Sequence, residues 1–175
     1  MLKTCVVYKS KYGATERYAK WLSGILKCEM IAHRDLSINR LNDYDIIVYG
    51  GGVYAGMISG ISYLKKNILK LQDKKIICFA VGAMPLDEKM VKELEKNNLK
   101  EKLSNIPLYY CRGELDESKL GFIHKKLIGF IKKMGGDNPI GKAIVSEDGV
   151  NDWIDIKYLE PVIRQERKLR ETENR

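Results

Sequence analysis

Apolar runs alternate with longer amphipathic segments along the first two thirds of the chain. Five runs rich in β-branched residues predict strands at 2–8, 29–35, 44–50, 74–82 and 106–113. Three other segments repeat apolar residues at helical spacing and predict helices at 14–27, 62–72 and 86–98. Three of the strands are continuous apolar runs, a pattern typical of strands covered on both faces of a parallel sheet. The alternation therefore predicts the α/β class, with a doubly wound, five-stranded parallel sheet and helices on both faces.

The pattern changes after the fifth predicted strand. Residues 118–136 are helix-like, 137–150 resemble a loop, and a last helix is expected to follow from 151. A five-stranded unit needs only one final helix to cover its sheet, so 116–150 is interpreted as an insertion. In the last helix, Pro161 is expected to introduce a kink or a break, and 164–175 to form a charged tail that frays or projects into solvent.

The inserted segment is both basic and amphipathic. Over 118–134 its apolar residues recur at helical spacing, while lysines occupy other turns. Such a helix can lie on an anionic membrane surface, or pack its apolar stripe on the domain and expose its lysines to water. The pattern leaves both placements open.

Composition narrows the class of protein. The 175 residues, 45% of them hydrophobic, suit a single domain, 1–175, with a sizeable core. The net charge of +8 favours an acidic partner or surface, although a lysine-rich solvated surface would also account for it. Nucleic acid is disfavoured, because no zinc finger or RNP-type motif occurs. The four cysteines form no CxxC pair and are expected to be free thiols. With no signal-peptide pattern and no membrane-spanning run, we expect a cytoplasmic protein.

The loop after the first strand has the composition of an anion site. It reads Ser10-Lys11-Tyr12-Gly13-Ala14-Thr15, with three hydroxyl side chains and a glycine directly before a predicted helix. The unpaired amides and partial positive charge of a helix N-terminus favour a phosphate there. The loop is neither a P-loop nor a Rossmann GxGxxG, and an ordinary strand-to-helix turn is the alternative.

Two further strand ends carry small residues. After the third strand the chain reads Gly50-Gly51-Gly52-Val53-Tyr54-Ala55-Gly56, a glycine-rich loop in which Tyr54 is placed to stack on a flat ring. After the fourth strand, Gly82-Ala83-Met84 would let backbone amides reach the edge of a planar heterocycle. Ligands of open α/β sheets bind at these carboxyl ends, so the three loops are expected to meet.

These three loops, in register along the alternating pattern, resemble the flavodoxin superfamily. The resemblance spans about residues 1–115 and the last helix, and it implies the strand order 2-1-3-4-5 and FMN as cofactor. In that family the first loop holds the FMN phosphate, and the other two cover a face and the pyrimidine edge of the ring. The implied cofactor-binding residues are Ser10, Lys11, Tyr12, Gly13, Ala14, Thr15, Gly51, Gly52, Val53, Tyr54, Ala55, Gly56, Gly82, Ala83 and Met84.

The inserted segment is similar to one branch of this superfamily, the flavodoxin-like, menaquinone-dependent protoporphyrinogen IX dehydrogenases. Lys133-Met134-Gly135-Gly136 and Asp152-Trp153 match phrases of that branch, in which the Asp-Trp pair begins the final helix. The resemblance implies an oxidoreductase that takes hydrogen from a porphyrinogen and passes electrons to a quinone at the membrane. Met84 stands where flavodoxins usually place a second aromatic residue, which would leave one ring face open to a substrate.

The alternative is an electron carrier that docks redox partner proteins and has no small-molecule substrate. Flavodoxins proper are acidic carriers, whereas this chain is basic. We name no catalytic residue, because hydrogen transfer to FMN is mainly the chemistry of the cofactor. Arg112, at the end of the fifth strand, is a candidate partner for a carboxylate.

Overall fold

A five-stranded parallel sheet forms the centre of the computed structural model, which describes residues 2–119, 121, 125–126, 129 and 150–172. Its strands are β1 (Thr4–Lys9), β2 (Glu29–Ala32), β3 (Ile46–Tyr54), β5 (Lys75–Gly82) and β6 (Leu108–Arg112). They lie in the order β2-β1-β3-β5-β6, and each neighbouring pair is parallel. Since these are the five predicted strands in sequence, the order confirms the predicted 2-1-3-4-5 sheet.

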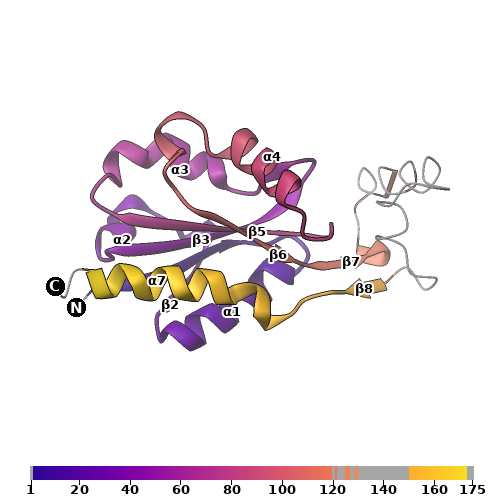
Figure 1. Cartoon of the computed structure of the whole chain (residues 1–175), viewed down its shortest axis with the longest axis horizontal. Helices are drawn as coiled ribbons and strands as arrows, with labels where there is room; N and C mark the ends of the chain where they lie inside the picture. The colour runs from indigo at the N-terminus through magenta and orange to yellow at the C-terminus, as the bar shows by residue number, and fades with distance from the viewer. Residues whose placement is uncertain (1, 120, 122–124, 127–128, 130–149, 173–175) are drawn as a thin grey trace.

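Helices cover both faces of the sheet (Figure 1). One face packs against α1 (Ala14–Leu26) and α7 (Glu160–Thr172), and the other against α2 (Ile38–Asn42), α3 (Ile61–Asn67) and α4 (Glu88–Asn98). Short 3₁₀ turns lie between these elements, at His33–Asp35, Ile68–Lys70, Glu101–Leu103, Glu117–Lys119 and Ile156–Leu159. Both faces of the central strands are buried, because successive side chains of a strand point to opposite layers. This burial explains the continuous apolar runs in the sequence.

Four short elements were not predicted from the sequence pattern. They are α2, β4 (Met57–Ile58), which pairs antiparallel with β3, and the antiparallel pair β7 (Glu114–Asp116) and β8 (Val150–Asp152). The β7–β8 pair joins the two ends of the predicted insertion beside the sheet (Figure 1). The bounds 116–150 remain a prediction, because most of that segment lies outside the described residues. The predicted helix at 118–136, with Met134 and its neighbours, also lies largely outside them.

The glycine-rich segment after the third strand is the clearest correction to the predicted elements. We predicted that strand to end at 50 and a loop to span 50–56, but β3 continues to Tyr54. The added residues pair with β5 through Gly52, and Val53 and Tyr54 pair with β4. Glycine has a low strand propensity, but here two neighbouring strands supply the hydrogen bonds that keep the backbone extended.

The C-terminal region differs from the prediction in three ways. Asp152 ends β8, and Trp153 follows it, so this pair does not begin the final helix, which starts at Glu160. Pro161 neither kinks nor divides that helix, because it lies in the first turn, where a missing N–H costs nothing. The helix also continues through Thr172 instead of fraying from 164.

A buried polar cluster explains why the charged end of α7 stays attached. Glu166, which is 1% exposed, accepts hydrogen bonds from Thr4 Oγ1 at 2.5 Å and from Arg170 Nε at 2.5 Å. Arg170 also donates to Thr4 Oγ1 at 2.8 Å. A buried carboxylate is tolerated when it is paired with a cation and hydrogen-bonded in this way. The helix is therefore held to β1 by polar contacts as well as by its apolar face.

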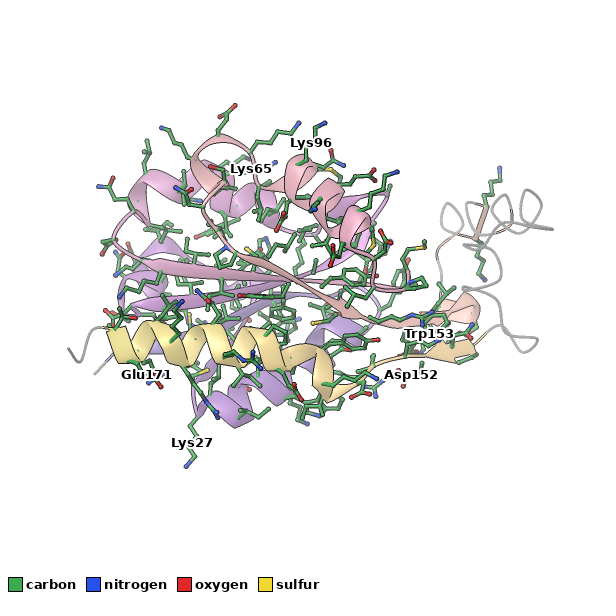
Figure 2. All side chains as sticks on the ribbon, viewed as in Figure 1. Lys27, Lys65, Lys96, Asp152, Trp153 and Glu171 are labelled. Carbon is green, nitrogen blue, oxygen red and sulfur yellow. The ribbon has the colours of Figure 1, made fainter. Side chains whose placement is uncertain are left out.

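Many lysines project from the surface of the domain. Lys27, Lys65 and Lys96 point away from the layers in Figure 2, and all three are exposed. Within the described part of the chain, no helix is long and apolar enough to cross a membrane. Cys5, Cys28, Cys78 and Cys111 are free thiols.

Candidate functional site

A cavity of about 300 Å³ opens at the carboxyl ends of the sheet strands. Its lining comes from the loop after β1, the β3–β4 hairpin, the loop after β5, and the segment after β6. The lining residues are Ser10, Tyr12, Ala14, Thr15, Gly52, Val53, Tyr54, Ala55, Gly56, Val81, Gly82, Ala83, Met84, Met90, Tyr110, Gly113, Glu114, Leu115, Asp116 and Lys119. The three loops singled out in the sequence therefore meet at one cavity, as their positions at parallel strand ends predicted.

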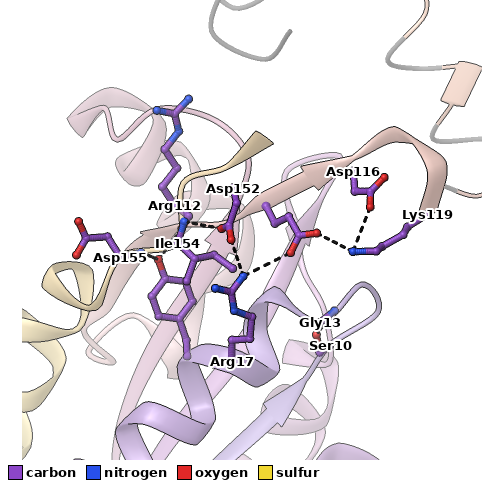
Figure 3. Close-up of polar contacts among 11 residues, drawn as sticks. Ser10, Gly13, Arg17, Arg112, Asp116, Lys119, Asp152, Ile154 and Asp155 are labelled. Atoms are coloured by element: carbon purple, nitrogen blue, oxygen red, sulfur yellow. Dashed lines mark hydrogen bonds and ion pairs between the residues drawn. The ribbon is translucent and has the colours of Figure 1, made fainter. Parts of the chain in front are cut away.

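The loop between β1 and α1 is shaped by its own residues. Ser10 Oγ accepts a hydrogen bond from the Gly13 N–H at 3.1 Å, which closes the turn (Figure 3). Gly13 stands at the helix N-cap with φ 102°, a conformation that other residues rarely adopt. Because a glycine occupies the cap, no side chain caps α1, and its first amides keep their affinity for an anion. Thr15 lies within this first turn and is 2% exposed.

The β3–β4 hairpin forms a second wall. A Cβ on Gly51 would lie 2.5 Å from the backbone oxygen of Ser59, so this glycine is needed for the approach of the chain after β4. Gly51 is buried and does not line the cavity. Lys11 and Gly13 also lie outside the lining, whereas the other predicted residues line it.

Two tyrosines connect the first loop with the hairpin. The rings of Tyr12 and Tyr54 meet edge to face, with their centroids 5.8 Å apart. The backbone of Lys11 makes a hydrogen bond to the Tyr54 hydroxyl. Burial raises the pKa of Tyr54 to about 12, with a further contribution from Tyr12, while the bond from Lys11 acts in the opposite direction. Tyr54 is therefore a neutral aromatic side chain at physiological pH, and its ring faces an apolar cavity.

The loop after β5 is held by contacts from β6 and from the residue that directly follows it. Tyr110 Oη donates to the Met84 carbonyl at 2.8 Å, and the Gly113 N–H donates to the Gly82 carbonyl at 2.7 Å. These bonds orient Gly82, Ala83 and Met84 along one side of the cavity. Arg112 stacks on Trp153, with its guanidinium carbon 4.0 Å from the ring centroid, and its Nε donates to the Ala83 carbonyl at 3.4 Å. Its pairing with a carboxylate stays a prediction.

A fourth wall was missed in the sequence. It comes from β7 and the turn after it, and it brings Glu114, Asp116 and Lys119 to the cavity. Lys119 Nζ lies 2.8 Å from Glu114 Oε1 and 3.1 Å from Asp116 Oδ2 (Figure 3). Their position in the sequence would have revealed them. An acidic stretch directly follows the fifth strand, so it starts at the carboxyl edge of the sheet, where the cavity lies.

Ion pairs attach the β7–β8 wall to α1. Arg17 Nη1 lies 2.8 Å from Asp152 Oδ2 and 3.6 Å from Glu114 Oε2, so it bridges both strands (Figure 3). Burial alone would raise the pKa of Asp152, but hydrogen bonds from Arg17 and from the Ile154 N–H outweigh it and lower that pKa. The same α1 turn therefore carries both the uncapped amides and the anchor of the fourth wall.

Tyr18 adds a buried tether at this corner. Its hydroxyl donates to the Arg112 carbonyl at 2.6 Å and accepts from the Asp155 N–H at 3.1 Å (Figure 3). Burial raises the pKa of Tyr18 well above its usual range. No group of three or more histidine, cysteine or acidic side chains suited to a metal ion occurs among the residues that the structure describes.

Solved structures with a similar chain path include several flavoproteins. A flavodoxin, WrbA-like protein from Agrobacterium tumefaciens is 23% identical, with a TM-score of 0.47 over 65% of this chain and 84% of that one. Megasphaera elsdenii flavodoxin is 17% identical, with a TM-score of 0.46 over 61% and 82%. An NADH:FMN oxidoreductase in its apo form is 14% identical, with a TM-score of 0.46 over 64% and 75%.

No curated protein sequence matches the chain. The family model described as "Flavodoxin domain" matches residues 5–140 of its 175 residues. This match begins in β1 and includes the loop after it, the β3–β4 hairpin, the loop after β5 and the fourth wall. The sheet order, the cavity at the carboxyl strand ends and the match over most of the sequence agree, and the chain belongs to the flavodoxin domain family.

Proposed function

We propose that the cavity binds FMN and that the protein is a flavin-dependent redox protein. Membership of the flavodoxin domain family supports this proposal. The observation that carries it is the pairing of two unlike features in one cavity. An uncapped helix N-terminus suited to a phosphate lies beside a wall of small and aromatic residues suited to a flat ring.

The residues present fit the cofactor at both ends. Ser10, Thr15 and the first amides of α1 would hold the phosphate, because they combine hydroxyl donors with the positive end of the α1 dipole. For the ring, the fit comes from the hairpin and the loop after β5, where glycine and alanine leave space for close approach. The ring-binding set would be Gly52, Val53, Tyr54, Ala55, Gly56, Gly82, Ala83 and Met84.

Bound FMN would supply a ring system that accepts two electrons together with hydrogen. The protein residues would hold it, shield it and leave part of it accessible. Neutral Tyr54 would cover apolar surface without bringing a charge to the site. The paired charges of Glu114, Asp116 and Lys119 would close the side that faces β7.

We further propose an enzymatic role, the oxidation of a porphyrinogen with a quinone as electron acceptor. Its support is the sequence resemblance of the segment after β6 and the fourth wall, which extends the cavity beyond the three cofactor loops. Met84 adds to this support, because a flexible thioether in place of an aromatic ring leaves space for a second flat molecule. A carrier docks its partner at an accessible cofactor edge and would have no use for such an added wall.

The first experiment is a titration of the purified protein with FMN, followed by absorbance and flavin fluorescence. We expect saturation at about one FMN per chain. Riboflavin, which lacks the phosphate, is the matched control and should bind at least about tenfold more weakly, since it forgoes the charge-assisted hydrogen bonds of the first loop. Equal affinity for both would contradict the phosphate site, and a protein that binds neither would refute the cofactor.

The second experiment tests the enzymatic role on the FMN-loaded protein. Under anaerobic conditions a porphyrinogen should bleach the flavin absorbance, and a menaquinone analogue should restore it. Formation of the porphyrin removes six electrons and each FMN accepts two, so porphyrin fluorescence should rise as the menaquinone analogue supports three flavin turnovers per porphyrin formed. If the flavin is bleached only by a reductase and not by a porphyrinogen, the chain acts as an electron carrier and the porphyrinogen role is wrong.

A further inference from the structure

Asn98, the last residue of α4, connects that helix to the cavity wall. Its side chain is 0% exposed and uses both ends of its amide. Oδ1 accepts from the Ile58 N–H at 2.8 Å, and Nδ2 donates to the Gly56 carbonyl and to the Leu94 carbonyl, both at 2.9 Å. The bond to Leu94 stays within α4, but the other two cross to the β3–β4 hairpin. Gly56 lines the cavity, so Asn98 bonds directly to a residue of the cavity wall.

The hairpin that Asn98 contacts has an unfavourable turn. Tyr54 pairs with Met57, and the two residues between them, Ala55 and Gly56, have φ values of 48° and 75°. Two positive φ values in a two-residue loop are the pattern of a type I′ turn, which favours asparagine or glycine at its first position. An alanine there costs about 1–2 kcal/mol in local strain. The strand beyond the turn, β4, contributes only Met57 and Ile58.

We propose that Asn98 is a positioning residue that holds the 54–57 turn in the conformation that binds the cofactor. This inference rests on the proposed function for its consequence, which is FMN affinity. An asparagine is suited to the role because it offers a donor and an acceptor on one short side chain. The hairpin presents a matching pair of groups, the Ile58 N–H and the Gly56 carbonyl. Without Asn98, these two backbone groups would lose their partner, and the strain at Ala55 would no longer be opposed.

The first test measures the rate of hydrogen exchange at the Ile58 amide, which bonds to Asn98 beside the turn, in FMN-free protein. Asn98→Ala should speed its exchange by at least about tenfold, the factor equivalent to the loss of one buried hydrogen bond. Asn98→Ser is the second variant, in case the alanine form does not fold. A helical serine can still bond the carbonyl four residues earlier, here Leu94, but is too short to reach the hairpin. The matched control is Lys96→Ala, at an exposed position of α4 whose side chain points away from the domain (Figure 2).

The second test measures FMN binding in the same variants. Asn98→Ala and Asn98→Ser should weaken binding by at least about tenfold, and Lys96→Ala should leave it unchanged. Adding Ala55→Gly to Asn98→Ala should raise the FMN affinity several-fold again, because glycine adopts the turn conformation without strain. A general loss of α4 packing would not be rescued by a change in the turn.

The outcomes separate the inference from the proposed function. Equal Ile58 exchange in the Asn98 variants and the Lys96 control would overturn the positioning role, whatever the FMN result. Faster exchange with unchanged FMN affinity would overturn its link to the cavity. If the wild-type protein binds no FMN, the proposed function fails, and with it the role of Asn98 toward the cofactor. Faster Ile58 exchange in the Asn98 variants would then show only that Asn98 stabilises the turn.

Discussion

The loop at 10–15 and the hairpin at 50–58 line the same cavity and are both built around glycines, yet they owe their shapes to different parts of the chain. The loop is closed locally, by Ser10 and Gly13, which are three residues apart. The hairpin is shaped from a distance, because Gly51 makes room for Ser59 and Asn98 bonds the turn from the end of α4. The difference teaches that similar composition at two strand ends does not imply similar structure.

This contrast has a consequence for substitution. A change in the loop should act mainly on local conformation and on anion binding, because its glycine has open space around it. A change at Gly50, Gly51 or Gly52 should act on the stability of the whole domain, because a Cβ at each of these positions would lie within 3 Å of a neighbouring side chain or backbone atom. The experiments below test this contrast, starting with the largest expected effect.

Gly51→Ala should have the largest effect. The new Cβ would lie 2.5 Å from the Ser59 carbonyl oxygen, and backbone cannot move aside as a flexible side chain can. We expect the free energy of unfolding to fall by about 3 kcal/mol or more, as for severe overpacking. Urea denaturation followed by circular dichroism measures it. Gly24→Ala, at an α1 position where a Cβ meets no atom within 4 Å, is the control and should be neutral or slightly stabilising.

Gly13→Ala should have an intermediate effect with a different cause. A Cβ at this position meets nothing within 4 Å, so the cost comes from the φ of 102° alone. We expect a loss of about 1–3 kcal/mol, divided between stability and FMN affinity. Urea denaturation measures the loss of stability, and isothermal titration with FMN and with riboflavin measures the loss of affinity. A variant with unchanged affinity for FMN relative to riboflavin would show that the loop does not hold the phosphate.

Ser10→Ala should have a smaller effect than Gly13→Ala. It removes the acceptor for the Gly13 N–H and one hydroxyl from the cavity. The expected loss of stability is about 0.5–1.5 kcal/mol, the usual contribution of one hydrogen bond. Thermal unfolding without FMN gives this value. Ser10→Thr keeps the hydroxyl and should recover most of it; if it recovers none, the hydrogen bond is not the cause.

The smallest effect is expected at the fourth wall, which ion pairs attach. The pKa of Asp152 is lowered in the folded protein, so its pairing stabilises the fold above the ordinary value of 3.8 and is lost as the pH falls below it. Both partners are more than one third exposed, so the contribution at neutral pH should be under about 1 kcal/mol. Asp152→Asn should therefore be slightly less stable than wild type at pH 7, and the difference should shrink as the pH falls below 3.8. A difference that does not shrink in acid would contradict this explanation.

Much of the fold could be predicted from the sequence, because the main elements are encoded by local patterns. Continuous apolar runs predicted the five strands, and their order was confirmed. The loop at 10–15 was also predictable, since a glycine before an amphipathic helix leaves the helix uncapped whatever surrounds it. The start of α4 is likewise set by a nearby residue. Asp87 is its N-cap, and Asp87 Oδ1 accepts a hydrogen bond from the Met90 N–H at 2.9 Å.

The remaining features depend on contacts between segments far apart in the chain, and only the tertiary structure decided them. The glycines at 50–52 are extended because β1 and β5 pair with them on either side. The wall at 114–119 reaches the cavity because Arg17 and β8 hold β7 beside α1. The sequence by itself determined the five main strands and the helix that begins without a side-chain cap. The remaining walls of the cavity depend on hydrogen bonds and ion pairs whose partners lie up to 135 residues apart, and such pairings leave no periodic pattern in a single sequence.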